Sequence, residues 1–198
     1  FGVYNGTIDW GDGNISANTF ANKTHTYSSP GVYTITISGT SIGFGSINNV
    51  GDKLKLIEIT KWGNFAFQGA SLQGYWFSGC QNLKLSGVTD TLILGNTTDL
   101  TSMFNGCTSL TTINNSNNWD VSNVQYMTNM FLNCNQFNDS GIASWNVSGV
   151  TNMNGMFFLN TLFNQDLSGW CVTLIPSLPT NFATSTPAWV LPKPIWGT

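Results

Sequence analysis

The chain has 198 residues, 41% of them hydrophobic, which is enough apolar material for one domain or for a domain with a small cap. Charged residues make up only 8% and the net charge is −3, with lysine as the only strongly basic residue. Phosphate contacts need clustered Lys or Arg, so this composition argues against nucleic-acid binding. The longest apolar runs are shorter than 18 residues, so the sequence predicts no membrane span.

Residues 1–45 are predicted to be β structure. Residues 9–13, Asp-Trp-Gly-Asp-Gly, form a tight-turn signal, because Asp and Gly favour turn conformations. Residues 32–38 alternate β-branched and aromatic side chains with a period of two, which predicts the clearest strand of the chain. His25, the one histidine, is expected to begin another strand.

The turn "DWGDG" and the following "THTY..PGVYTITISG" resemble the polycystic-kidney-disease (PKD) type of β-sandwich module. The segment has about half the length of such a module, so the resemblance implies a PKD-like hairpin unit and not a full sandwich. PKD-like modules are adhesive or spacer elements outside cells, and the resemblance carries that expectation to residues 1–45.

Residues 53–59 alternate partly and are predicted to form a strand that leads into the next region, with Trp62, Phe65 and Phe67 covering the end of its core. Beyond them, one phrase occurs four times, at residues 76–80, 103–107, 130–134 and 156–160. Its phenylalanines recur at intervals of 27, 27 and 26 residues: Phe77, Phe104, Phe131 and Phe157. A constant period in this range predicts copies that stack on one another, with like side chains in columns.

Each cycle has two spacings. Val-x-x-Met-x-x-Met-Phe has a spacing of three and predicts a helical or 3₁₀ turn, whereas Trp-x-Val has a spacing of two and predicts a short strand. The predicted fold class is therefore an α+β repeat: a short leucine-rich-repeat solenoid, with a strand and a short helical turn per repeat of about 26 residues and an N-terminal antiparallel β cap. The tryptophans at the start of the cycle, Trp119, Trp145 and Trp170, are interpreted as core in preference to a ligand platform.

Three domains are predicted: a PKD-like β-hairpin cap over 1–45, the repeats over 46–172, and a proline-rich cap over 173–198. The last segment holds five of the six prolines, which cannot donate to a strand ladder, so it should lie irregularly over the last repeat. Its apolar anchors are expected to be Phe182, Trp189 and Trp196.

The repeats carry a second resemblance. "NNWDVSNVQYMTNMFLNCNQFN", "ASWNVSGVTNMNGMFFLNTLFNQDLSGWCV" and "MFNGCTSL" are similar to the BspA-like leucine-rich-repeat surface proteins. The resemblance covers nearly half of the chain and implies a surface protein of a bacterium, or a fibre or decoration protein of a tailed-phage particle.

Cysteine is the first candidate for chemistry. Cys80, Cys107 and Cys134 share one column, which favours small buried residues, and a disulfide between adjacent copies is the alternative. A metal site is disfavoured because Cys-x-x-Cys and Cys/His pairs are missing. Cys171 falls in a different column, and Asn160 takes the cysteine place in the last copy of the phrase.

The other polar candidates have structural interpretations too. His25 with Ser28 and Ser29 does not make a catalytic triad, because adjacent residues cannot supply that geometry. Oxygen ligands in the turn are too few for the six to eight that Ca²⁺ prefers, and paired carboxylates of a glycosidase would have to face each other across a groove. Matching asparagines that directly follow a second recurring phenylalanine, Phe137 and Phe163, are expected to order loops. The turn with too few Ca²⁺ ligands is the one that contains Asp9, Asp12 and Asn14. The carboxylates considered as a glycosidase pair are Asp120 and Asp166, and the asparagines expected to order loops are Asn138 and Asn164.

The sequence thus predicts no catalytic, cofactor-binding or metal-binding residues. The expected function is a non-catalytic, surface-exposed adhesion or recognition module, in the first place a fibre or decoration protein of a phage virion. The alternatives are a bacterial cell-surface adhesin or lipoprotein domain, and an accessory carbohydrate-binding domain of a larger enzyme. Expected partners are a host or cell-surface receptor such as a glycan, other structural subunits and further copies of the chain. The expected location is extracellular or on the virion surface, and a start at Phe1 without Met indicates a piece of a longer or processed protein.

Overall fold

The computed structural model describes residues 5–39, 52–64 and 74–198. The chain divides into two compact units, the first made of Phe1–Phe44 with Asn64–Ala70 and the second of Gly45–Gly63 with Ser71–Thr198. None of the helices in the described ranges is long and apolar enough to cross a membrane. The elements of the first unit are β1 (Thr7–Asp9), β2 (Ile15–Ala17), the 3₁₀ helix η1 (Phe20–Asn22) and β3 (Thr36–Ile37), and those of the second are the 3₁₀ helices η3 (Lys53–Lys55), η4 (Ser116–Asn118) and η5 (Gly141–Ser144).

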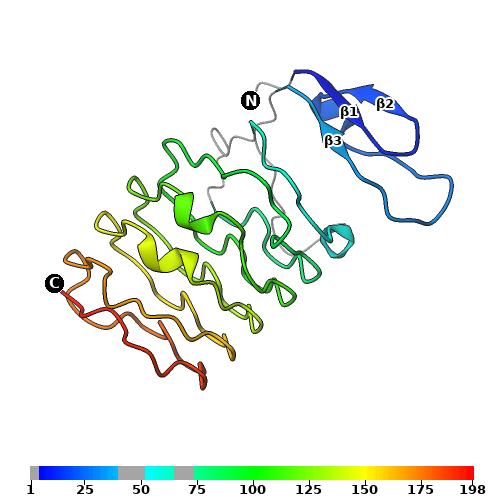
Figure 1. Ribbon diagram of the computed structural model, residues 1–198. Helices are drawn as coiled ribbons and strands as arrows, with labels where there is room; N and C mark the ends of the chain where they lie inside the picture. Colours follow the sequence, from blue (N-terminus) through cyan, green and yellow to red (C-terminus); the bar gives the residue numbers. More distant parts are fainter. Residues whose placement is uncertain (1–4, 40–51, 65–73) are drawn as a thin grey trace. The chain divides into compact units, whose positions relative to one another are not determined.

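The first unit contains a small antiparallel sheet with the strand order β2-β1-β3 (Figure 1). Ile8 of β1 lies opposite Ser16 on one side and Ile37 on the other. The turn between β1 and β2 is closed by the Trp10 N–H, which donates to the Asn14 carbonyl at 3.1 Å. The predicted tight turn is therefore confirmed.

Two strand predictions in this unit are wrong. Of the predicted strand over 32–38, the structure assigns only Thr36–Ile37 to a strand, and the Ser38 N–H adds a hydrogen bond to the Thr7 carbonyl at 2.9 Å. The preceding Tyr33 makes a local contact, in which its hydroxyl donates to the Ser29 carbonyl at 2.7 Å. His25 does not begin a strand. Its ring lies in a row of aromatic rings instead, 4.8 Å from the ring of Trp10 and 4.7 Å from that of Tyr27.

The row of aromatic rings helps to hold together a unit in which few side chains are buried. Among its described residues only Ile8, Trp10 and Asn18 are buried. The His25 Nε2 lies 2.7 Å from the Asp12 Oδ2, which ties the row to the β1–β2 turn. This hydrogen bond lowers the pKa of the Asp12 carboxyl.

In the second unit the predicted fold class, the α+β leucine-rich-repeat solenoid, is wrong. Its described residues contain no α-helix, and the only sheet in the described chain is the small antiparallel one of the first unit. The repeats consist of turns and coil with isolated parallel bridges, such as Leu85 with Ile113, where strands were predicted. The predicted strand over 53–59 is η3 followed by a single bridge at Glu58.

The contacts between copies of the phrase explain this difference. The phenylalanine rings do form the predicted single file: neighbouring centroids are 5.6 Å apart from Phe77 to Phe104, 5.6 Å from Phe104 to Phe131 and 5.8 Å from Phe131 to Phe157. All four rings are buried, and Figure 1 shows the chain of this unit as successive neighbouring coils. The column prediction is thus confirmed at the level of side chains, although the backbone is not the one predicted.

The backbone donors alternate along each phrase. One N–H group donates to the carbonyl three residues earlier and closes a turn, and the next donates to the following copy of the phrase. In the third copy the turn-closing donors are Met130, Leu132 and Cys134, and the donors to the fourth copy are Asn129, Phe131 and Asn133, at 2.8, 3.0 and 2.8 Å from the carbonyls of Asn154, Met156 and Phe158. An α-helix would close every N–H within its own segment, and a strand would close none of them with the carbonyl three residues earlier, so this mixed pattern is neither.

Left-handed residues create this alternation. Each phrase contains one residue with positive φ, and the residue just before the phrase is another, four positions earlier; the two interrupt any helix after a single turn. Glycine and asparagine fill many of these places because they adopt this conformation at low cost. The pairs are Tyr75 and Gly79, Ser102 and Gly106, Asn129 and Asn133, and Gly155 and Leu159, and the pair Asn181 and Ser185 continues them in the C-terminal segment.

The C-terminal segment packs on the fourth phrase. The Phe157 N–H donates to the Phe182 carbonyl at 2.9 Å, and the Trp189 ring lies 4.7 Å from that of Phe163. Of the three predicted anchors, Phe182 and Trp189 are buried, while Trp196 is half-buried with its ring 4.9 Å from that of Phe182.

The tryptophans of the repeats are core residues, as predicted. Trp119, Trp145 and Trp170 are all buried, and the rings of Trp119 and Trp145 stack at 5.9 Å. At the other end of the unit, Trp62 is buried with its ring 5.9 Å from that of Phe77, whereas the predicted partners Phe65 and Phe67 lie outside the described residues.

Replacing Phe131 by Ala is expected to lower the free energy of unfolding of the second unit by about 3 to 5 kcal/mol, because it opens a cavity between two stacked rings. Urea unfolding followed by tryptophan fluorescence measures this loss. Phe158→Ala is the matched control, since Phe158 is only half-buried and lies outside the file. Equal losses for the two variants would contradict the role of the file.

Leu159→Asn is expected to raise the free energy of unfolding by about 1 kcal/mol, because a leucine in the left-handed region costs roughly that much and asparagine adopts it more easily. Leu159 has a φ of 65° and occupies the place of Asn133 in the preceding copy. Leu162→Asn is the control, an exposed leucine without a positive φ. The idea fails if both variants change stability in the same way.

Asp12→Asn is expected to lower the melting temperature of the first unit at pH 7. A carboxyl whose pKa is lowered by folding contributes stability above its unfolded pKa, near 3.8, and that contribution disappears as the pH falls through the folded pKa. The difference between wild type and variant should therefore close as the pH is lowered below about 4. Thermal unfolding at several pH values measures it, and a difference that persists at pH 2 would refute the assignment.

Candidate functional site

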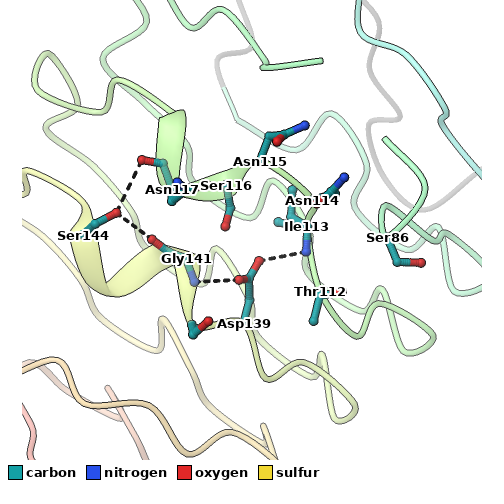
Figure 2. Close-up of a pocket in the computed structure, with 11 residues that line it drawn as sticks. Ser86, Thr112, Ile113, Asn114, Asn115, Ser116, Asn117, Asp139, Gly141 and Ser144 are labelled. Carbon is teal, nitrogen blue, oxygen red and sulfur yellow. Dashed lines mark hydrogen bonds between the residues drawn. The ribbon is translucent and has the colours of Figure 1, made fainter. Parts of the chain in front are cut away.

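The second unit has an open polar depression beside η4 and η5, with a volume of about 450 Å³ (Figure 2). Its lining comes from three successive cycles of the chain. Hydroxyl and amide side chains dominate it, and Asp139 is its one ionisable residue. The lining residues are Ser86, Thr112, Ile113, Asn114, Asn115, Ser116, Asn117, Asp139, Ser140, Gly141 and Ser144.

Two 3₁₀ turns shape the depression. η4 begins after Asn115, whose left-handed φ of 61° turns the chain sharply into the helix. η5 lies so close to η4 that a Cβ atom on Gly141 would overlap the hydroxyl of Ser116. Glycine is therefore required at this position, and the close approach of the two turns brings their polar side chains to one surface.

Asp139 joins the two turns. It is only 6% exposed, and its two carboxylate oxygens accept hydrogen bonds at 2.8 Å from the Ile113 N–H and the Gly141 N–H. Both oxygens are occupied by backbone donors, as the dashed lines in Figure 2 show. The carboxylate is thus a structural link between successive cycles and is poorly placed to act as a base.

The turns are also anchored from below. The Trp145 Nε1 donates to the Ser116 carbonyl at 2.9 Å, and the Trp170 Nε1 donates to the Ile142 carbonyl at 3.1 Å. On the surface, the Ser144 hydroxyl donates to the Gly141 carbonyl at 2.8 Å. The buried indoles therefore hold the floor of the depression in place while its rim remains polar.

The chemistry of this surface is neutral hydrogen bonding. Hydroxyls and amides donate and accept, so they suit ligands that are themselves neutral and rich in hydroxyl or amide groups. Nothing in the described parts of the chain groups three or more His, Cys, Asp or Glu side chains as a metal site would need. The lining can therefore hydrogen-bond a neutral polar ligand.

Asp120 and Asp166 each close their own turn. Each carboxylate accepts from the N–H at 3.0 Å and the hydroxyl at 2.6 Å of the serine two residues later, Ser122 and Ser168 respectively. These hydrogen bonds lower the pKa of both carboxyls. The structure thus gives each of the two acids a local partner of its own.

The residues of the N-terminal turn are likewise structural. The Asp9 carboxylate accepts from the Gly11 N–H at 2.9 Å and the Asp12 carboxylate from the Asn14 N–H at 3.1 Å, so the tight-turn interpretation of these residues is confirmed. His25 has Asp12 as its hydrogen-bond partner and does not pair with a serine.

The cysteine column is confirmed as a column of small buried residues. Cys80, Cys107 and Cys134 are free thiols, and Cys171 is exposed and also free. The Cys107 thiol donates to the Phe77 carbonyl at 3.1 Å and the Cys134 thiol to the Phe104 carbonyl at 2.9 Å. Desolvation raises the pKa of Cys80 to about 11 and also raises the pKa values of Cys107 and Cys134, so these three groups stay protonated.

Asn138 and Asn164 order loops, as predicted. The Asn138 Oδ1 accepts from the Asn164 N–H at 2.9 Å, and the Asn164 Oδ1 accepts from the Val190 and Leu191 N–H groups, both at 3.0 Å. Each side-chain amide oxygen thus accepts hydrogen bonds from backbone N–H groups of the following cycle. This outcome could be predicted from the sequence because both asparagines follow a recurring phenylalanine, Phe137 and Phe163 respectively.

Sequence reasoning missed the depression itself. Its residues do not belong to the repeated phrase, and the connection from Thr112 to Trp119 has no close copy elsewhere in the chain. The one available signal was Asp139-Ser140-Gly141, an acid and a glycine two residues apart in the loop before Trp145. It marks a turn but does not tell which backbone groups the acid will bind.

The comparisons with known proteins concern the same region. A family described as "Mycoplasma protein of unknown function, DUF285" matches residues 97–187, which include most of the repeats and the lining of the depression except Ser86. It is a surface-repeat family related to the BspA-like proteins, so the resemblance holds in this coarser form. Residues 1–45 lie outside the match, and nothing found supports their PKD-like resemblance. No curated protein and no solved structure matches the chain.

Proposed function

We propose that the chain is a non-catalytic recognition module on a biological surface, and that it contacts its ligand at the polar depression beside η4 and η5. The observation that carries the proposal is that three acidic side chains are occupied by hydrogen bonds within the fold. Asp139, Asp120 and Asp166 bind groups of the framework, which leaves a surface of hydroxyls and amides. Such a surface can select a ligand by hydrogen bonding without attacking it.

A neutral glycan is the ligand class that fits this lining. Sugar hydroxyls pair with Ser, Thr and Asn side chains in both directions, and they need no charged partner. The repeat tryptophans Trp119, Trp145 and Trp170 are buried in the core and cannot stack on a sugar ring, so affinity would depend on many hydrogen bonds from several copies on one surface. Weak single contacts and strong multivalent attachment are typical of adhesion.

The setting we favour is a bacterial cell surface. The matched family is described as Mycoplasma proteins, which supports this setting over a phage virion. The virion fibre or decoration protein and the accessory domain of an enzyme are the alternatives, and both would use the same depression for attachment. The proposed contact surface is therefore the same in all three settings.

Ser140→Lys is expected to reduce glycan binding at least tenfold, because it places a long charged side chain on the rim of a neutral site. Ser140 is exposed and only its carbonyl is hydrogen-bonded, so the fold should tolerate the change. Gln136→Lys is the matched control, since it adds the same charge at an exposed residue of the same cycle outside the lining. The measurement is binding of multivalent chain to a glycan array and to whole cells.

Two results would contradict the proposal. One is binding that both lysine variants weaken equally, which would place the contact elsewhere or make it purely electrostatic. The other is a multivalent preparation that binds neither glycans nor cells while its melting curve shows a folded protein.

A further inference from the structure

Ser116, at the base of the depression, carries a hydroxyl that the fold does not use. The residue is only 2% exposed. Its backbone is fully engaged: the N–H donates to the Ile113 carbonyl at 3.1 Å, and the carbonyl accepts from the Trp119 N–H at 3.1 Å and the Trp145 Nε1 at 2.9 Å. Its hydroxyl has no hydrogen-bond partner among the residues that the structure describes. A nearly buried hydroxyl in this state costs free energy, which indicates a partner from outside the chain.

This hydroxyl is directed into the depression. Ser116 belongs to the lining, and Figure 2 shows its side chain pointing from η4 toward Asp139 and Gly141. A Cβ atom on Gly141 would overlap the hydroxyl, so the absence of a side chain at this glycine keeps the space beside it free. The unused hydroxyl therefore faces a place that a ligand group can enter.

Two more polar groups meet at the same place. The position that a Cβ of Gly141 would occupy lies 3.0 Å from the backbone nitrogen of Asn117 and 3.2 Å from the Oδ1 of Asp139. Within the described ranges the Asn117 N–H has no acceptor. The Asp139 Oδ1 accepts from the Gly141 N–H, and a carboxylate oxygen has a second lone pair for a further donor. The base of the depression thus offers a donor, an acceptor and a hydroxyl that can be either.

A neutral hydroxyl is the ligand group that fits these three atoms. Its oxygen accepts from the Asn117 N–H and the Ser116 hydroxyl, while its hydrogen is donated to the Asp139 Oδ1, which keeps its bonds to the framework. A carbonyl oxygen has no hydrogen to donate, so it would set its lone pairs against the carboxylate. A carboxylate or phosphate would be repelled by the same negative charge. An apolar group would leave the serine and the N–H without partners.

We propose that Ser116 is the specificity-determining residue of the depression and that it selects one free hydroxyl group of a neutral glycan. This inference rests on the proposed function, because it assigns a role within the same contact surface. A site built to hydrogen-bond a hydroxyl rejects an analogue that lacks it, since the polar groups of the site are then left unpaired. The exposed serines and asparagines around the rim supply further contacts, and Ser116 decides which glycan is accepted.

Ser116→Ala tests the role of the hydroxyl, because it removes one oxygen atom and nothing else. The probes are neutral gluco-, galacto- and manno-configured oligosaccharides on an array, each with its monodeoxy analogues, and the protein is the multivalent chain. Wild type should bind one deoxy analogue at least tenfold more weakly than its parent. Ser116→Ala should bind that parent at least tenfold more weakly and should no longer distinguish the two. Ser140→Ala, which removes a hydroxyl from an exposed lining residue, is the matched control and should keep the discrimination.

Thermal unfolding of the same proteins separates recognition from folding. Ser116→Ala should melt no lower than wild type, because the lost hydroxyl has no partner in the fold, and a lower melting temperature would overturn the inference. The inference alone is overturned if Ser140→Lys weakens binding while Ser116→Ala keeps the discrimination of wild type, since the depression would then bind the glycan without reading this hydroxyl. Wild-type protein that is folded and binds none of the glycans overturns the proposed function and this inference together.

Discussion

The structure of the second unit depends on how its backbone donors are shared. Every other N–H group of the phrase closes a turn within one copy, and the groups between them bind the next copy. Each copy is therefore stable only as part of a series, since half of its hydrogen bonds lie outside itself. The buried rings and thiols fill the interior that this backbone encloses, and the surface of the unit is left to the irregular connections between phrases.

The sequence revealed the side-chain columns but not the backbone. Phe77, Phe104, Phe131 and Phe157 could be aligned because identical residues recur at a fixed interval, and buried columns need only that interval. The spacing of three in Val-x-x-Met-x-x-Met-Phe is shared by a helix and by a run of separate turns. Asn129 and Asn133 decide between them through their left-handed conformation, and φ values cannot be read from spacing alone.

The candidate site was harder to predict for a different reason. Asp139 and Gly141 act across two cycles, through contacts with Ile113 and Ser116 that are about 26 residues away in sequence. In contrast, the local turns at Asp9, Asp12, Asp120 and Asp166 involve partners two residues away and follow from the sequence. The structural role of the acids in local turns could therefore be inferred from the sequence. The position of the neutral depression could not, because its lining residues are far apart along the chain.

The neutrality of the depression has a consequence for the environments in which the protein can work. Interactions between exposed charges weaken as salt accumulates around them, whereas hydrogen bonds between uncharged groups do not depend on such screening. The rim beside η4 and η5 contains serine, threonine and asparagine, and the cycles beneath it are joined through backbone groups and stacked rings. Attachment through this surface would keep its strength from dilute fluids to brine, where a surface that attracts its ligand by charge would release it.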